Sequence, residues 1–228
     1  MVTKKKKSPF MIQDYPELVK YFAAKNPVQL FLFVIPLLTL MLSVIIKSQL
    51  SFTQTAILVL FGAFYWTFLE YAIHRFAYHS NYPFKWMKYF LGSFHMYHHA
   101  QMDDRRVLNA GFLMVSTVTP VVLVPFYVLT NDLALVAAMG LGTASAHYAY
   151  EWVHFMLHYK EYDNGYLAYI QKYHFHHHDN APMKNFGNTS HFWDVVFGTY
   201  DPAYKNYRMS KETASTLITE KKKVSVHA

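Results

Sequence analysis

Four long runs without charged residues constrain this chain more than any other feature. The first covers residues 28–46 and holds 19 residues with a single Gln and no charge. At about 1.5 Å per helical residue, such a run can cross a hydrocarbon core of roughly 30 Å. The other runs are residues 52–69, 107–130 and 133–146. A soluble bundle of buried helices is the alternative, but four such runs in 228 residues leave little polar surface. The runs therefore predict transmembrane helices.

The connections between the runs predict two helical hairpins. Only a few residues separate the first run from the second, and the third from the fourth. The fourth run is short by itself, and we expect its helix to continue through Tyr150. With this arrangement, 20 of the 21 Lys and Arg residues fall on one side of the membrane and only Lys47 on the other. Because Lys and Arg are enriched in cytoplasmic segments, this count predicts that both termini are cytoplasmic.

The composition supports a membrane protein and excludes several kinds of site. Charged residues make up 15% of the chain, below the roughly 25% typical of soluble domains. There are no cysteines, which excludes disulfides, Cys-ligated zinc, iron–sulfur clusters and a cysteine nucleophile. The net charge is +7, and its Lys and Arg residues are distributed as expected for a membrane protein. We therefore expect no nucleic-acid partner.

We predict one membrane domain over residues 1–228. Residues 1–27 form a basic N-terminal segment with a possible interfacial helix near residues 9–24. Residues 28–212 carry the transmembrane helices and a histidine-rich cap. Residues 213–228 are a polar, basic tail that we expect to be mobile.

Ten of the fourteen histidines fall into four clusters with spacings that suit metal ligands. Residues i and i+4 share one face of a helix, and neutral imidazole is a metal ligand. Ten ligands are too many for one ion and suit two. Zn, Cu, Fe and Ni all accept imidazole, so the spacing leaves the metal open. The clusters are HxxxxH (His74, His79), HxxHH (His95, His98, His99), HxxxH (His154, His158) and HxxHH (His174, His177, His178).

The other four histidines are not predicted ligands, and His227 lies in the predicted tail. His176 lies out of frame within the last cluster, and we expect it to point elsewhere. His147 lies two turns before His154, so it shares that face of the predicted helix. His191 has no clustered partner.

The four histidine boxes, with hydrophobic hairpins between them, resemble the fatty acid hydroxylase/sterol desaturase superfamily of integral membrane di-iron oxygenases. The resemblance covers roughly residues 74–201. The closing stretch, residues 185–199 (NFGNTSHFWDVVFGT), resembles most the fatty acid 2-hydroxylase branch. Sterol-modifying relatives end in a similar segment, and carotenoid hydroxylases share the box spacings. The chain departs from the pattern in having no Pro in residues 100–106, and we expect no fused cytochrome b5 domain of the kind that eukaryotic 2-hydroxylases often carry, because the sequence shows no haem motif.

The resemblance implies an all-α membrane protein with four transmembrane helices and a cytoplasmic histidine-rich cap. The ten clustered histidines would bind two iron ions, which zinc can replace in a purified sample. The implied activity is O2-dependent hydroxylation of a lipid acyl chain, with 2-hydroxylation of a fatty acid or sphingolipid as the leading interpretation. A sterol or carotenoid hydroxylase or desaturase is the alternative within the superfamily. A metal store or transporter is the alternative outside it, but transporters place ionisable groups inside the membrane, and the four runs nearly lack them.

Side chains near the boxes are candidates for supporting roles. Tyr150, four residues before His154, is the candidate for holding the polar end of the substrate. Glu151 and Glu70 are candidates to accept an imidazole N–H close to the metals. Asp194 is expected to be structural.

Electrons must come from a separate protein, because the chain has no Cys and no GxGxxG nucleotide motif. We expect cytochrome b5, or a ferredoxin with its reductase, docking on the basic cytoplasmic face. The host membrane would be the endoplasmic reticulum or a bacterial inner membrane.

Overall fold

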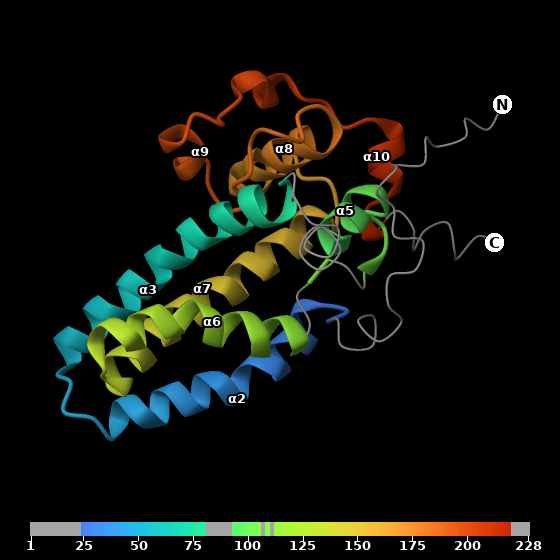
Figure 1. Cartoon of the computed structure of the whole chain (residues 1–228). Helices are drawn as coiled ribbons and strands as arrows, with labels where there is room; N and C mark the ends of the chain where they lie inside the picture. The colour runs from blue at the N-terminus through green and yellow to red at the C-terminus, as the bar shows by residue number, and fades with distance from the viewer. Residues whose placement is uncertain (1–23, 81–92, 106–107, 110–111, 220–228) are drawn as a thin grey trace.

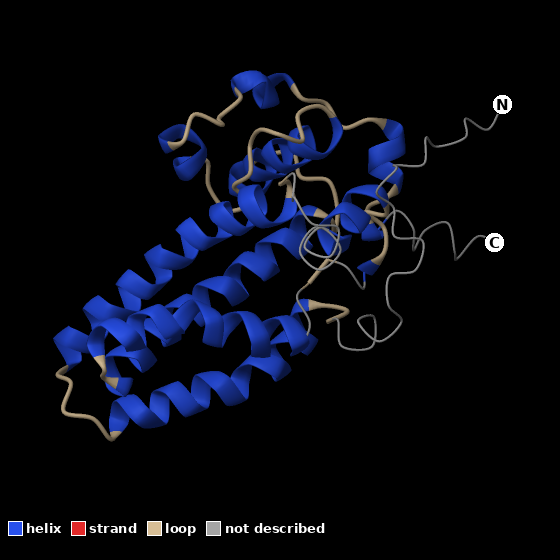
Figure 2. Ribbon diagram, viewed as in Figure 1, coloured by secondary structure: helices blue, strands red, loops and turns tan. Residues whose placement is uncertain are grey.

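The computed structural model describes residues 24–80, 93–105, 108–109 and 112–219, and these residues form an all-helical protein (Figures 1 and 2). One isolated β-bridge pairs Ala24 with Asn109, and the described part of the chain contains no strand. The prediction of an all-α fold is confirmed. The possible interfacial helix and residues 220–228 lie outside the described residues.

The elements are α2 (Pro27–Ile46), α3 (Phe52–Ala72), the π-helix η1 (Ile73–Tyr78), α5 (Ser93–Ala100), α6 (Phe112–Thr130), α7 (Leu133–Leu157), α8 (Gly165–Asp179), α9 (Phe192–Val196), the 3-10 helix η4 (Pro202–Asn206) and α10 (Lys211–Ser215).

Polar caps set where the long helices begin. Ser51 starts α3 with a capping box. Its hydroxyl accepts from the Gln54 backbone N–H, and the Gln54 side-chain oxygen accepts from the Ser51 backbone N–H. Asp132 caps α7 by accepting from the first backbone N–H groups of that helix. From this cap, α7 continues without a break to Leu157, as predicted, and so carries the third histidine box at its end.

Small residues let α3 and α7 approach each other closely. A Cβ atom added to Gly62 on α3 would lie 2.0 Å from the Met139 carbonyl oxygen, and one added to Gly142 on α7 would lie 1.9 Å from the Val59 oxygen. The Thr143 hydroxyl donates to the Gly62 carbonyl oxygen at 3.0 Å. Only glycine fits at these crossings, which is how membrane helices often pack. This contact fixes α3 against α7, the two helices that lead to the first and third histidine boxes.

The outer faces of the long helices are apolar. Leu60 on α3 is 70% exposed and Leu129 at the end of α6 is 81% exposed. Among the described residues, two helices are long and apolar enough to cross a membrane, namely Pro27–Ile46 and the continuous helix Phe52–Tyr78. The sequence predicts four such helices. In the described part of the chain, α6 contributes a shorter apolar helix, Thr119–Thr130, and α7 does not meet this test of length and composition.

A cap of short helices covers one end of the hairpins (Figure 1). It contains α5, α8, α9, η4 and α10, and its core includes Leu157, Ile170 and Tyr173. The expectation of a mobile tail from residue 213 is wrong for residues 213–219. Leu217 and Ile218 are buried there, and the Ile218 backbone N–H donates to the His158 carbonyl oxygen at 3.0 Å. The tail therefore anchors the chain directly after the third box.

Candidate metal centre

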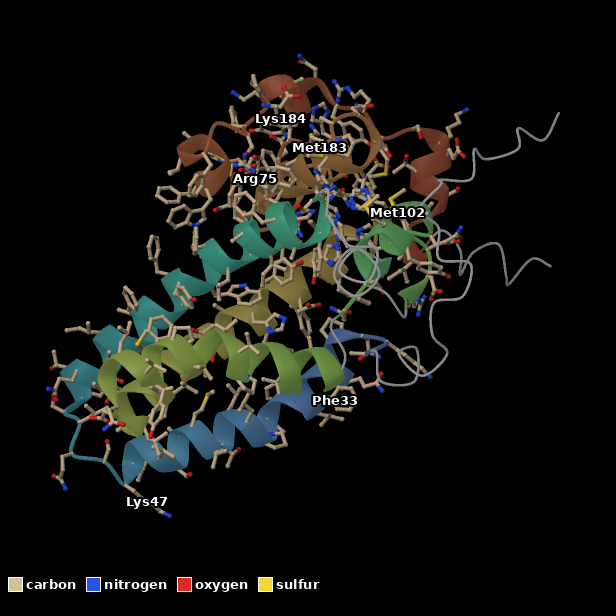
Figure 3. The ribbon with its side chains drawn as sticks, in the orientation of Figure 1. Phe33, Lys47, Arg75, Met102, Met183 and Lys184 are labelled. Carbon is tan, nitrogen blue, oxygen red and sulfur yellow. The ribbon has the colours of Figure 1, made fainter. Side chains whose placement is uncertain are left out.

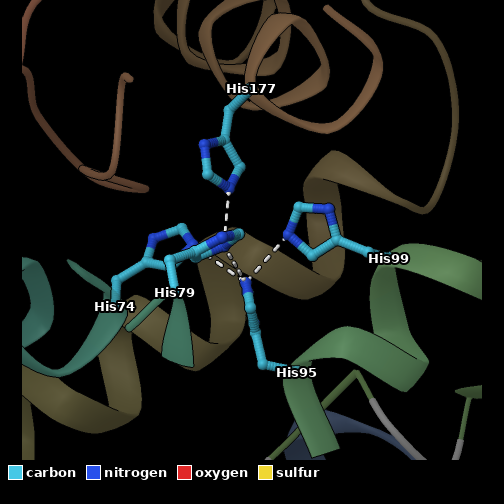
Figure 4. A group of neighbouring side chains, drawn as sticks. All are labelled: His74, His79, His95, His99 and His177. Carbon is cyan, nitrogen blue, oxygen red and sulfur yellow. Dashed lines mark hydrogen bonds between the residues drawn. The ribbon is translucent and has the colours of Figure 1, made fainter. Parts of the chain in front are cut away.

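The four predicted histidine boxes meet at the junction of the hairpins and the cap. Nine of the ten predicted ligands form two groups, and within each group one ring nitrogen per residue lies within 4.8 Å of all the others. Figure 4 shows the first group, with rings from three elements converging on one point. We call these sets group one (His74, His79, His95, His99, His177) and group two (His98, His154, His158, His174).

A π-helical turn brings the first box together. The structure places the HxxxxH box across η1, which directly follows α3. The His79 backbone N–H donates to the His74 carbonyl oxygen, five residues earlier, at 3.2 Å. Since the π-helix pairs residues i and i+5, it brings both rings to group one where an α-helix would separate them.

Each of the two HxxHH boxes contributes histidines to both groups. On α5, His95 and His99 share a face and enter group one, whereas His98 enters group two. On α8, His177 enters group one and His174 enters group two. Each helix therefore lies between the groups. On α5 the adjacent residues His98 and His99 lie about 100° apart around the helix, and on α8 His174 and His177, three residues apart, lie about 60° apart.

His178, the tenth predicted ligand, lies between the groups. It follows His174 by one turn, and their ring centres are 4.4 Å apart. Its ring also stacks on His99, with centres 3.9 Å apart, and lies 4.9 Å from the His98 ring. Both His178 ring nitrogens are buried without a hydrogen-bond partner.

Hydrogen bonds fix the tautomer of four rings, two in each group. Each donates its Nδ1–H to an oxygen, because a carbonyl oxygen cannot donate. The Nε2 atom of each ring therefore carries a lone pair. The pairs are His74 with Phe186 O at 2.5 Å, His177 with Lys184 O at 2.7 Å, His154 with Leu108 O at 2.9 Å, and His174 with Asn188 Oδ1 at 2.8 Å.

The Nε2 atoms then face one another across each group. His95 Nε2 lies 2.9 Å from the Nε2 atoms of His74, His79 and His99. One neutral imidazole nitrogen cannot satisfy three such neighbours with hydrogen bonds. Group two has one such close pair, with 2.9 Å between the Nε2 atoms of His158 and His174. Lone pairs at these distances repel, and a cation between them removes the repulsion.

Other buried ring nitrogens also indicate metal binding. The following ring atoms have no hydrogen-bond partner: both nitrogens of His98, Nε2 of His154 and Nδ1 of His158. An unpaired buried polar atom costs about 1–3 kcal/mol, so several in one place require an explanation. Metal ligation provides one, and the donor set, made only of imidazoles, suits a transition metal.

The electrostatic surroundings keep the imidazoles neutral. Burial lowers the pKa of His79 to about 4 and that of His177 to about 3. Burial, together with neighbouring imidazoles, lowers the pKa of His98 and His174 well below 6.5. Neutral imidazole is the form that binds metal, so these rings are ready to bind at neutral pH.

A single loop, residues 184–189, holds rings of both groups. The carbonyl oxygens of Lys184 and Phe186 accept from group one, and the Asn188 side chain accepts from group two. Asn185 has a φ of 57°, and a Cβ atom on Gly187 would lie 1.9 Å from the Ser190 oxygen. The NFGN sequence thus allows a turn that aims acceptors at both groups.

Two buried carboxylates fix this loop. Glu70 accepts from the backbone N–H groups of Asn188 and Thr189 at 2.6 and 2.8 Å. Asp194 accepts from the backbone N–H groups of Phe186 and Gly187 at 2.9 and 2.8 Å, which agrees with its predicted structural role. The prediction that Glu70 accepts an imidazole N–H is wrong, because the loop backbone and the Thr189 hydroxyl use its carboxylate.

Glu151 and Tyr150 lie beside group two on α7. Glu151 accepts from His147 Nε2 at 3.3 Å and from the Asn109 side chain at 3.0 Å, whereas the Nδ1–H of His154 is taken by Leu108. The imidazole contact predicted for Glu151 is made with His147, which lies outside the boxes. The Tyr150 hydroxyl accepts from Asn188 Nδ2 at 3.2 Å, so it contacts the side chain that holds His174.

The described histidines that are not predicted ligands make other contacts. His176 contacts Asp201 at 2.9 Å, as expected for a ring out of frame. His147 stacks on Trp66, with ring centres 4.3 Å apart, and His191 contacts the Tyr169 hydroxyl. Sequence reasoning missed Asn188 and the loop carbonyls. The NFGNT sequence was noticed, but only contacts with distant residues reveal its role.

Comparison with known proteins identifies relatives over most of the chain. Residues 59–199 match the family described as fatty acid hydroxylase. The dihydroceramide fatty acyl 2-hydroxylase FAH2 of Arabidopsis thaliana is 32% identical, over 72% of this chain and 69% of its own length. Human fatty acid 2-hydroxylase is 29% identical, over 64% of this chain and 40% of its own length. The solved structure of full-length scs7p, with only its hydroxylase domain visible, has a TM-score of 0.65 and 27% identity, and the likeness covers 83% of this chain and 71% of that one.

Proposed function

The chain belongs to the fatty acid hydroxylase family and is a hydroxylating oxidoreductase, and we propose that it hydroxylates carbon 2 of the acyl chain of a sphingolipid or fatty acid. The relatives that match it carry 2-hydroxylase names in plants and animals. The observation that carries the proposal is the pair of buried imidazole groups, each with ring nitrogens spaced closely enough to hold a metal ion.

The ten clustered histidines are proposed to hold two iron ions, one in each group. His178 joins group two as its fifth ligand, because it lies on the same face of α8 as His174 and its nitrogens are unpaired. When bound, the two irons supply the activation of O2 for insertion of one oxygen atom into an unactivated C–H bond. The loop of residues 184–189 keeps the rings oriented, and burial excludes water. Electrons come from a separate carrier, cytochrome b5 or a ferredoxin with its reductase.

The proposed setting is a membrane crossed by α2, α3, α6 and α7, with both termini and the cap in the cytoplasm. Two observations support it. The outward faces of these helices are apolar, and in the predicted topology 20 of the 21 Lys and Arg residues of the sequence fall in segments on one side of the membrane. The acyl chain would lie among the helices and meet the metal groups at the cytoplasmic end of α7. The membrane would be that of the endoplasmic reticulum or a bacterial cell.

Tyr150 is proposed to hold the polar end of the substrate. Its hydroxyl lies at the end of α7 next to group two, and its ring is nearly parallel to that of His154, with centres 6.0 Å apart. Glu151 is a positioning residue in this proposal, because its carboxylate contacts the side chains of His147 and Asn109.

Lipid mass spectrometry tests the proposal. The wild type, His177→Ala and His176→Ala are expressed in a host with an active electron-transfer chain, and lipids are fragmented. Acyl chains with one extra oxygen at carbon 2 are expected from the wild type and His176→Ala, and not from His177→Ala. An oxidised or newly unsaturated sterol or carotenoid would assign the protein to the other branch. No lipid change, with tight metal binding and adequate electron supply, would favour a metal store.

A further inference from the structure

The short helix α9 presents two different faces. Its inner side chain, Asp194, is fully buried and holds the loop that orients the histidines. Its outer side chains are large and apolar, with Phe192, Val195 and Val196 between 51% and 56% exposed. Phe197, the next residue, is also exposed. In water such a contiguous apolar face is a liability, so a partner that is itself apolar is needed to cover it.

The outer face of α9 continues the apolar outer face of α3. The Phe192 and Trp193 rings lie 6.3 and 5.7 Å from that of Phe64, which is itself exposed. Trp193 also donates its indole N–H to the Thr67 hydroxyl at 3.0 Å. Figure 1 shows α9 beside the part of α3 that approaches the cap.

The position of the α9 contact along α3 indicates how deep in the membrane that contact would lie. Phe64 and Phe68 follow the first residue of α3 by 12 and 16 positions, which corresponds to about 18 and 24 Å along the helix. A hydrocarbon core is roughly 30 Å thick. If α3 enters the membrane at Phe52, the part of α3 that touches α9 is still within the apolar layer.

Cations lie at the cap end of this surface. Arg75 donates to the Tyr71 hydroxyl at 2.6 Å, and the Tyr71 ring stacks on Phe197. Lys184, which is exposed, donates to the Gly198 carbonyl oxygen at 3.3 Å. Figure 3 labels both side chains at the cap above the end of α3. Apolar side chains bordered by Lys and Arg are typical of segments that lie at a membrane interface.

We propose that the outer face of α9 is embedded in the cytoplasmic leaflet of the bilayer beside α3, with Arg75 and Lys184 at the level of the lipid head groups. This inference rests on the proposed membrane-spanning role of α3. The cap is then partly sunk into the membrane on this side. The same short helix touches lipid with one face and the histidine-bearing loop with the other.

Site-directed spin labelling tests this directly, because the chain has no native cysteine. Single variants Val196→Cys, Leu60→Cys and Ala203→Cys are labelled and reconstituted in phosphatidylcholine–phosphatidylglycerol vesicles. Leu60 is the reference for the span, and Ala203 in η4 is an exposed position of the cap. Val195→Cys serves as a second α9 label. Power-saturation measurements compare collisions with O2, which partitions into lipid, and with a water-soluble nickel chelate.

The labels at residues 196 and 195 are expected to match that at Leu60, accessible to O2 and shielded from nickel, whereas Ala203 shows the reverse. Nickel access at residue 196 equal to that at Ala203, with Leu60 shielded, would overturn the inference and leave the span intact. Shielding from both reagents would indicate cover by protein, such as a second copy, and would also overturn it. Nickel access at Leu60 would reject the span itself.

Discussion

The two histidine groups use the same ligand in different surroundings. Group one contains two partly exposed rings, His79 and His99, and its members come from the end of α3 and from the cap. Group two is fully buried, and two of its four rings lie at the end of α7, the helix against which α3 packs. Group two is thus anchored to the packed core, whereas group one lies at its rim. The comparison indicates that the two metals should differ in how firmly they are held.

The groups are also coupled, because residues 184–189 accept hydrogen bonds from both. A change in that loop should therefore affect both metals, whereas a change in one ring should affect one. Substitutions can separate these two kinds of effect.

Removing one ring from α8 should have the largest effect. His174→Ala should lose the metal of group two, and His177→Ala that of group one, each leaving about one metal per chain. Activity should fall by more than the roughly 10- to 100-fold typical of residues that only orient ligands. His176→Ala, in the same helix, should keep both metals. Elemental analysis and product formation measure this, and loss of both metals from either single variant would mean that the groups are not separate sites.

Substituting Asn188 should have the next largest effect. Asn188→Ala removes the acceptor for His174 Nδ1 and releases the contact with Tyr150. Loss of such an orienting partner typically costs 10- to 100-fold in metal affinity or activity. Asn180→Ala, near the end of the same helix as His174, is the control, because Asn180 contacts His176 instead. Equal activity of the two variants would show that the loop does not orient the ring.

A chelator should remove the metal of group one before that of group two, since His79 and His99 are partly exposed. The single-metal variants make the order measurable. His174→Ala, which keeps group one, should lose its remaining metal faster than His177→Ala. Metal content is followed over time after addition of a chelator, and the reverse order would contradict the assignment of group one to the rim.

Acid should destabilise the metal-free protein. The folded pKa values of His79 and His177 are about 4 and 3, whereas an unfolded histidine titrates near 6.5. Between these values the unfolded chain binds protons that the folded chain does not, so stability is lost as the pH falls from about 6.5 toward 4. The melting temperature in detergent should drop across this range, and His79→Gln should reduce the drop. A melting temperature unchanged over this range would rule out the neutral buried rings.

Tyr150→Phe should have the smallest effect on activity if the hydroxyl only contacts Asn188. One neutral hydrogen bond contributes about 0.5–1.5 kcal/mol, which corresponds to a roughly 2- to 12-fold loss of activity. If Tyr150 also holds the substrate, KM should rise while the metal content stays at the wild-type value. Steady-state kinetics with matched metal analysis distinguish these results, and full activity with an unchanged KM would remove Tyr150 from the substrate site.

Helical periodicity and spacing were enough to predict the all-helical fold, the continuation of α7 and the convergence of the boxes. They did not predict how the histidines of each box are divided between the two groups. His98 joins a different group from His95 and His99 because α5 lies between the groups, and that placement depends on contacts with α7 and α8. The acceptors at Phe186 and Asn188 lie up to 112 residues from the rings they hold, so no local pattern indicates them. The packed segment 213–219 was missed because its two buried apolar side chains lie in a polar stretch.

Anomalous diffraction at the iron edge, on crystals of the iron-loaded protein, tests the central claim most directly. The account predicts two separate peaks, one among the Nε2 atoms of group one and one among the rings of group two with His178 beside it. A single peak, or iron bound outside both groups, would contradict it.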